Sequence, residues 1–408
     1  MNLKNIFYSI LLTLPVILNF LKVFFLAENI ELEIFGKYSL YLTYGVFISY
    51  IFNSGLNEGS LRLGSIYKFN GKSANEISRF IFSNIFVVSA LGSITALFFT
   101  IFFYDFYDFN YMLATIFSSV AIVQFNILSV KFRIYEDFTK IAILFIIKNS
   151  IGLLIYFFLL GFVDDNSFSK LFLFETFVVF IVGVILIPVI YRSKLIIKPK
   201  SIILTIKEGF FQCYTFSVKG SFYTLDRHFA SINLSGINLG IYSKALLINQ
   251  FFIAGGGVIV QLLQQFFIDK SLSVGIYASS YKIMKTLIKF ILCFIFLGTI
   301  FFVIQEDIIN SFLNYFDLDI SNTSLFLLII CGILNGSNLF DSLAISSSKS
   351  YILFISTLTV IAIWVVLYQF WISYSSETFD INSQISLFTL YSTLTFLAGL
   401  YFIKKEKK

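Results

Sequence analysis

The stretch FIFSNIFVVSALGSITALFFTIFF, residues 80–103, contains no charged side chain. Each residue of an α-helix adds about 1.5 Å, so this stretch is long enough to cross a hydrocarbon core of about 30 Å. Similar apolar runs recur along the whole chain of 408 residues, which is 58% hydrophobic and 13% charged. Soluble domains carry about 25% charged residues. The sequence therefore predicts an all-α integral membrane protein with many spans.

Twelve apolar runs of suitable length can be placed along the chain. The first run is too long for the core of a signal peptide and contains Lys22, so we expect it to remain as a membrane helix. The predicted spans cover residues 6–27, 35–56, 80–103, 110–129, 141–162, 170–190, 212–235, 240–267, 284–304, 322–341, 351–373 and 384–403.

The loops between these spans alternate in charge. One set of loops, together with the two termini, contains 21 of the 29 basic residues, for example in the segments 62–79, 131–140 and 192–207. The opposite set is acidic, as in residues 28–33 and 305–321. Basic loops stay on the cytoplasmic side of a membrane. We therefore expect both termini to be cytoplasmic.

The chain also resembles two copies of a six-span unit. Gly36-Lys37-Tyr38-Ser39 begins the second predicted span, and Gly240-Ile241-Tyr242-Ser243 begins the eighth, 204 positions later. Six spans is an even number, so the two copies share one orientation and are related by an axis along the membrane normal. The sequence predicts an N-terminal lobe of residues 1–204 and a C-terminal lobe of residues 205–408. Transporters often bind their substrate between two such repeats.

Two segments resemble a known family. Phe35-Gly36-Lys37-Tyr38-Ser39-Leu40, followed by Asn53-Ser54-Gly55-Leu56-Asn57 and Arg62, is similar to the start of bacterial polysaccharide flippases. Leu225-Asp226-Arg227, followed by Leu239-Gly240-Ile241-Tyr242-Ser243-Lys244-Ala245, resembles the signature of their second half. The family is the O-antigen (Wzx-type) flippases of the multidrug, oligosaccharidyl-lipid and polysaccharide (MOP) exporter superfamily, whose length and span number also match.

This resemblance implies two six-helix lobes that open alternately to each side of the bacterial inner membrane. The implied substrate is an O-antigen or capsule repeat unit linked to undecaprenyl pyrophosphate, which moves to the periplasmic leaflet. H⁺ or Na⁺ is the implied coupling ion, and no cofactor is expected. Further implied partners are membrane lipids, a polysaccharide polymerase and a chain-length regulator.

Several ionisable residues lie deep in the predicted spans, where each costs about 2.5–3.5 kcal/mol on insertion scales. The basic ones outnumber the acidic ones, which suits a pyrophosphate because Arg and Lys bind its oxygens. We assign the lining of a substrate cavity to Lys22, Arg227, Lys219, Lys148, Lys244 and Asn19, and coupling or pairing between lobes to Asp226 and Glu175.

Each of these assignments has a simpler alternative. Lys22, Asp226 and Arg227 could form a structural ion pair. Glu175 and Lys244 lie near the predicted outer ends of their spans, where they could be solvated residues at the rim. Cys213, Cys293 and Cys331 lack the spacing of a metal site, and we expect them to be packing residues.

Three other classes of protein can be compared with this sequence. A membrane polysaccharide polymerase or O-acyltransferase needs catalytic loops, but the longest external loop, residues 305–321, contains neither Arg nor His. A multidrug exporter of the same superfamily would share the topology and favour an acidic cavity for cationic drugs. A formal charge of +6 could suggest nucleic acid, yet no basic soluble surface is predicted. A flippase therefore fits best.

Overall fold

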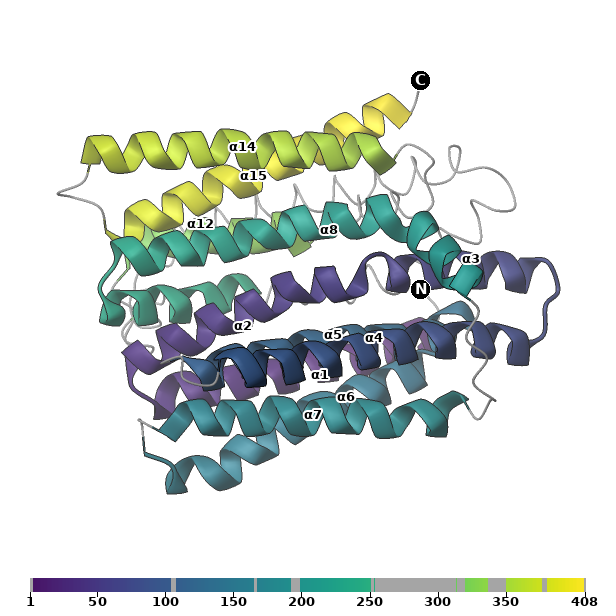
Figure 1. The fold of residues 1–408 in the computed structure, drawn as a ribbon. Helices are drawn as coiled ribbons and strands as arrows, with labels where there is room; N and C mark the ends of the chain where they lie inside the picture. The colour runs from purple at the N-terminus through teal and green to yellow at the C-terminus, as the bar shows by residue number, and fades with distance from the viewer. Residues whose placement is uncertain are drawn as a thin grey trace. The chain divides into compact units, whose positions relative to one another are not determined.

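The computed structural model describes residues 3–103, 108–164, 167–191, 199–250, 253, 313, 320–336, 350–375 and 380–406. Its described elements are helical, as the sequence predicts, and no strand occurs among these residues (Figure 1). The helices are α1 (Leu3–Asn29), α2 (Leu32–Asn53), α3 (Leu56–Phe69), α4 (Ala74–Phe103), α5 (Phe109–Ile134), α6 (Phe138–Leu159), the short 3₁₀ helix η1 (Leu160–Phe162), α7 (Phe168–Tyr191), α8 (Pro199–Asn233), α12 (Asn322–Gly336), α14 (Ser350–Ser375) and α15 (Ile381–Glu406). Residues 236–250 are also helical.

The chain forms two compact units, Met1–Thr224 and Leu225–Lys408. The transition between them lies inside α8, whose first 26 residues belong to the first unit. The lobes predicted from the sequence, residues 1–204 and 205–408, remain a prediction.

Helix α5 lies at the centre of the first unit, where α2, α3, α4, α6 and α7 contact it. Its polar residues find partners on these neighbours: the hydroxyl of Ser119 donates to the Gly45 carbonyl at 2.8 Å, and the Gln124 amide donates to the Ser89 hydroxyl at 2.8 Å. Hydrogen bonds of this kind, made by small polar side chains, join helices that pack inside a membrane.

In the second unit, α15 packs against α12 and α14. The indole N–H of Trp364 on α14 donates to the Leu387 carbonyl of α15 at 2.9 Å. The amide of Asn249 donates to the Leu328 carbonyl of α12 at 2.9 Å. These bonds fix helices that are distant in the sequence.

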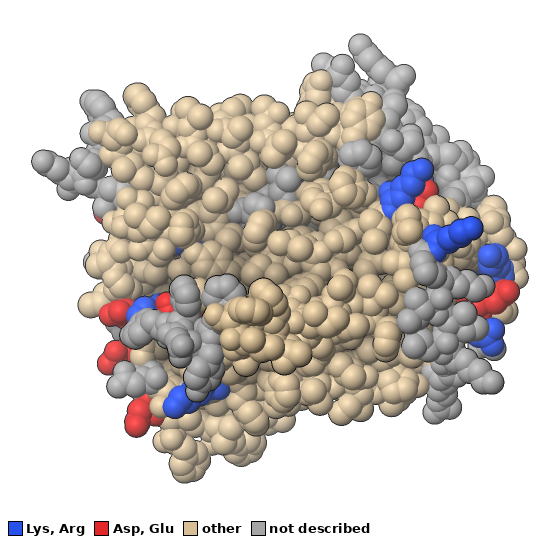
Figure 2. Space-filling view, in the orientation of Figure 1, with Lys and Arg blue, Asp and Glu red and all other residues tan. Residues whose placement is uncertain are grey.

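Six of the described helices are long and apolar enough to cross a membrane, including residues 76–102 of α4 and 351–373 of α14. Their outward surfaces are apolar, with Ile101 on α4 66% exposed and Val366 on α14 66% exposed. On the face shown in Figure 2, charged side chains gather near the helix ends and leave an uncharged band between them. The chain is therefore a multi-pass membrane protein, and its span number of twelve remains a prediction.

Two boundaries differ from the predicted ones. Residues 57–79 were expected to form a loop, but most of them form the amphipathic helix α3, which continues beyond α2 after a sharp turn. Helix α8 begins at Pro199, well before the predicted start at residue 212. The predicted span 284–304 and most of 240–267 lie outside the described residues.

The antiparallel helices of the first unit place Asn70 at the basic end and Asp164 at the acidic end, and both side chains are exposed. We expect a cysteine at position 164 to react with a membrane-impermeant thiol reagent in intact cells, since acidic loops face outward. A cysteine at position 70 should react only after the membrane is permeabilised. The measurement uses single-cysteine variants without the native cysteines, and the opposite labelling pattern would invert the topology.

Candidate functional site

An ion pair is buried within the first unit. The Lys22 ammonium on α1 lies 3.1 Å from Glu175 Oε1 on α7, and the two residues are 8% and 5% exposed. An opposite charge at this distance stabilises both ionised groups in a low-dielectric interior. The pair therefore joins the first and sixth membrane helices of this unit.

Two buried tyrosines complete this polar cluster. Tyr38 on α2 lies beside Lys22, and the Tyr156 ring on α6 lies 6.0 Å from the Lys22 ammonium. The Tyr38 ring also packs edge-on against Phe172 on α7, with centroids 5.0 Å apart. The cluster thus takes one polar or charged residue from each of four helices and holds them with aromatic contacts.

Gly152 on α6 makes room for the ion pair. A Cβ atom at this position would lie 2.6 Å from Glu175 Oε1 and 3.1 Å from Lys22 Cδ. Lys148 lies one turn earlier on the same helix, 5.8 Å from the centre of the Phe125 ring. Among the described residues Lys148 forms no ion pair. It is therefore a partly buried cation close to a pair that is already neutral.

A second polar cluster lies inside the second unit. Asp226 on α8 is fully buried and accepts hydrogen bonds from the Tyr242 hydroxyl and, at 2.7 Å, from the Gln384 amide of α15. The Tyr368 hydroxyl on α14 donates to Gln384 Oε1 at 2.9 Å, and the Asn233 amide donates to Tyr368 at 3.3 Å. Each of these hydrogen bonds joins two different helices.

The two clusters have the same construction. Each takes a charged residue from the first helix of its half, a tyrosine from the second, a tyrosine from the fifth and an acid or amide from the sixth. Lys22 and Asp226 lie 204 positions apart, and so do Tyr38 and Tyr242 of the repeated Gly-x-Tyr-Ser segments. The remaining equivalent residues are Tyr156 with Tyr368 and Glu175 with Gln384.

The chemistry of the two clusters differs. The first contains an ammonium paired with a carboxylate, whereas the second contains one carboxylate held by a hydroxyl and an amide. Arg227, the next residue on α8, is 2% exposed. The two clusters thus occupy similar positions in the sequence and differ in their charges.

A sharp corner between α2 and α3 forms a third feature. Ser54 (φ 42°) and Gly55 (φ 89°) adopt left-handed conformations, which end α2 and turn the chain into α3. The backbone of this corner touches α8 directly: a Cβ atom on Gly59 would overlap the Thr205 carbonyl, and one on Gly209 would overlap the Gly55 carbonyl. Only glycine allows two helix backbones to approach this closely.

Polar contacts secure the corner. The Asn53 amide donates to Glu58 Oε2 at 2.8 Å, and its oxygen accepts from the Asn57 backbone N–H at 2.8 Å. Burial raises the pKa of the Glu58 carboxyl, while hydrogen bonds from its own backbone and from Asn53 oppose that rise. Arg62 and Glu208 form a half-exposed ion pair of 3.4 Å between α3 and α8. The motif residues 53–57 and Arg62 thus build a helix corner.

The structure brings some of the predicted site residues into contact with one another and leaves others apart. Lys22 and Glu175 meet, and Asp226 joins Tyr242 and Gln384 in its own unit. The interpretation of Glu175 and Lys244 as solvated rim residues is wrong, because they are 5% and 7% exposed.

The two remaining predicted cavity residues are Asn19 and Lys219. The Asn19 side chain is exposed, one turn from Lys22. Lys219 lies within α8, but its side chain is outside the described residues. Cys213 and Cys331 are buried free thiols, as expected of packing residues.

The sequence interpretation did not assign roles to Tyr38, Tyr242, Gly152 or Gln384. The repeated Gly-x-Tyr-Ser segments carry the signal for the two tyrosines, since each tyrosine follows a charged residue of the preceding span by 16 positions. Gly152 and Gln384 give no such signal, because their roles arise from contacts between distant helices.

No protein-family model matches the chain, and no curated protein matches it in sequence. Solved structures match its fold. One is the MATE multidrug transporter DinF-BH, with a TM-score of 0.68, 17% identity and coverage of 98% of this chain and 94% of that chain. Another is a multidrug resistance MATE family transporter of the MOP superfamily in an outward-facing conformation, with a TM-score of 0.56, 12% identity and coverage of 98% and 95%.

The eukaryotic MATE transporter AtDTX14 matches with a TM-score of 0.56, 12% identity and coverage of 97% and 92%. The matches extend over nearly the full length of both chains, so the MATE-like transporter fold predicted from the sequence is confirmed. At these identities the likeness concerns the fold alone.

Removing one partner of the Lys22–Glu175 pair should destabilise the protein by about 3–5 kcal/mol, because the other charge stays buried without compensation. We expect Lys22→Met and Glu175→Gln each to lower the thermal unfolding midpoint of the purified protein in detergent. The double variant Lys22→Met/Glu175→Gln should lose much less than the sum of the two. Strictly additive losses would show that the two side chains are not coupled.

Gly59→Ala and Gly209→Ala should separate α3 from α8, since the new methyl groups overlap backbone atoms of the facing helix. The separation can be measured as disulfide formation between cysteines placed at Arg62 and Glu208, whose side chains are in contact. We expect efficient cross-linking in the parent and a several-fold lower rate in either glycine variant. Gly161→Ala is the matched control, because nothing lies within 4 Å of its new Cβ atom; equal rates in all variants would contradict the close backbone contact.

Proposed function

We propose that this protein is a flippase for an anionic, lipid-linked oligosaccharide. The observation that carries the proposal is the sign of the charges inside the predicted spans. The basic residues Lys22, Lys148, Lys219, Arg227 and Lys244 lie deep in these spans, against the two acidic residues Glu175 and Asp226. Charged residues within membrane segments are retained for a function and face the interior of the bundle. An excess of positive charge favours a negatively charged cargo such as a pyrophosphate.

The first polar cluster supports this proposal. Glu175 forms an ion pair with Lys22, whereas Lys148, one turn from Gly152 on α6, forms no ion pair with a described acidic residue. An incoming pyrophosphate can bind this cation without first displacing a protein carboxylate. Buried tyrosines in the same cluster offer flat surfaces and hydroxyl groups of the kind that sugars contact.

The proposed substrate is a repeat unit of O-antigen or capsule carried on undecaprenyl pyrophosphate, and the proposed direction is from the cytoplasmic to the periplasmic leaflet of the bacterial inner membrane. The MATE-like fold supports transport by alternating access. We propose H⁺ or Na⁺ as the coupling ion. Transport changes no covalent bond, so the proposal includes no catalytic residue. A polymerase and a chain-length regulator would act on the exported product.

Multidrug export is the second candidate, because the structures that match this fold include MATE multidrug transporters. Such an exporter would need a cavity suited to drugs. Cationic drugs would be repelled by the excess of basic residues in the predicted spans. The two candidates therefore differ in the charge of the cargo that the protein moves.

We expect loss of the protein to leave complete, single lipid-linked repeat units on the cytoplasmic leaflet, since their synthesis does not depend on transport. The measurement is access of an impermeant lectin to the glycan in right-side-out and inside-out membrane vesicles. Complementation by Lys148→Arg should restore export better than Lys148→Met at matched protein levels, because only the arginine keeps the charge.

Two outcomes would contradict the proposal. Repeat units that accumulate on the periplasmic face would indicate a polymerase. A normal distribution of glycan, together with greater sensitivity of the cells to cationic drugs, would indicate a multidrug exporter.

A further inference from the structure

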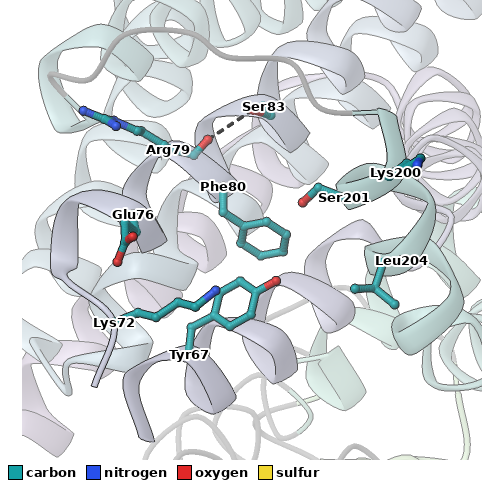
Figure 3. Close-up of a pocket in the computed structure, with 9 residues that line it drawn as sticks. All are labelled: Tyr67, Lys72, Glu76, Arg79, Phe80, Ser83, Lys200, Ser201 and Leu204. Carbon is teal, nitrogen blue, oxygen red and sulfur yellow. Dashed lines mark hydrogen bonds between the residues drawn. The ribbon is translucent and has the colours of Figure 1, made fainter. Parts of the chain in front are cut away.

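A pocket of about 480 Å³ opens at the basic end of the first unit, and its lining residues do not belong to the Lys22–Glu175 cluster. It lies between the end of α3, the start of α4 and the first two turns of α8 (Figure 3). Tyr67 and Phe80 form its aromatic floor, with ring centroids 5.4 Å apart. Ser201 and Leu204 of α8 line the opposite side.

Three cationic side chains line this pocket: Lys72 and Arg79 from the α3–α4 side and Lys200 from α8. The Lys72 ammonium lies 4.0 Å from the centre of the Tyr67 ring. Within the described part of the chain, none of the three cations belongs to an ion pair. Like charges gathered around one pocket repel each other, and a bound anion would relieve that repulsion.

The single carboxylate that lines the pocket, Glu76, is hydrogen-bonded to the start of α4. Glu76 Oε2 accepts hydrogen bonds from the backbone N–H and the hydroxyl of Ser73, at 3.0 and 3.2 Å, and the Ser73 hydroxyl accepts from the Glu76 N–H at 3.3 Å. This reciprocal arrangement is a capping box at the start of α4. It holds the carboxylate to the helix end, so the pocket keeps a net positive charge.

The position of the pocket indicates how the anion arrives. The candidate membrane span of α4 begins at Glu76, so the pocket lies at one end of this span. Exposed apolar side chains flank it, with Phe69 at the end of α3 64% exposed and Ile203 on α8 65% exposed. Cations, hydroxyl donors and an aromatic floor at this level suit the head of an anionic lipid whose chains continue into the bilayer.

We propose that this pocket binds the phosphate headgroup of an anionic membrane lipid. Lys72, whose ammonium lies over the Tyr67 ring, binds the phosphate, and the exposed side chains of Arg79 and Lys200 at the rim (Figure 3) turn toward it, with the Ser201 hydroxyl as a further donor. A lipid held in this way connects α4 to α8 beside the glycine contact of α3 with α8. Anionic lipid should therefore stabilise the docking of α8 on the first unit.

The test uses the full-length protein in a neutral detergent and native mass spectrometry with added phosphatidylglycerol or phosphatidylcholine. Arg79→Gln/Lys200→Gln should weaken phosphatidylglycerol binding about tenfold. Lys140→Gln/Lys207→Gln is the matched control, since it removes two exposed positive charges from the same end outside the pocket. Its affinity should stay within about twofold of the parent. Equal losses in both variants would overturn the proposal in favour of diffuse surface charge.

Further experiments distinguish a lipid headgroup from a soluble anion and test the location of the site. Leu204→Trp fills the pocket without a change of charge and should weaken phosphatidylglycerol binding as the charge variant does; unchanged binding would contradict the proposed location. Inorganic pyrophosphate that displaces the lipid at equal concentration would assign the pocket to a soluble anion instead. Phosphatidylcholine that binds as tightly as phosphatidylglycerol would exclude selection for an anionic headgroup.

Discussion

The absence of water in the bilayer interior is the constraint on which this structure depends. A polar group between membrane helices has to find its partner within the protein. Lys22 forms an ion pair with Glu175, and Asp226 accepts hydrogen bonds from Tyr242 and Gln384. In each half these contacts join the first helix to the second and sixth, so helices that are far apart in the sequence are held together by one buried charge. The polar clusters are thus part of the packing as well as candidate sites.

The corner between α2 and α3 adds a constraint at the basic end. Gly55, Gly59 and Gly209 let the backbones of α3 and α8 touch, and the Arg62–Glu208 pair covers the contact. Helix α8 is 35 residues long and contributes to both compact units. The contact with α3 therefore fixes the first part of α8 on the first unit.

Much of the fold follows from the sequence, because apolar length and loop charge are local signals. The all-α membrane architecture and the buried positions of Lys22 and Asp226 were accessible in this way, whereas the MATE-like fold was implied by the family resemblance of two motif segments. Helix α3 was missed because its amphipathic sequence lies between two apolar runs and reads as a polar loop. The partner of Lys22 was missed because Glu175 is 153 positions away, and helical periodicity gives no information about which distant helix faces which. The repeated Gly-x-Tyr-Ser segments, by contrast, marked Tyr38 and Tyr242, each of which lies beside the charged residue of the preceding helix in its half.

The Lys22–Glu175 ion pair also bears on where an anion could bind in the first unit. Lys22 is paired with Glu175, and Asp226 is hydrogen-bonded within its own unit. A pyrophosphate that takes Lys22 has to leave Glu175 buried without a partner, which costs several kcal/mol. Lys148 carries no such cost, because no described carboxylate pairs with it. Of the two lysines, Lys148 is therefore the stronger candidate for first contact with substrate, and Lys22 the stronger candidate for holding the helices that surround it.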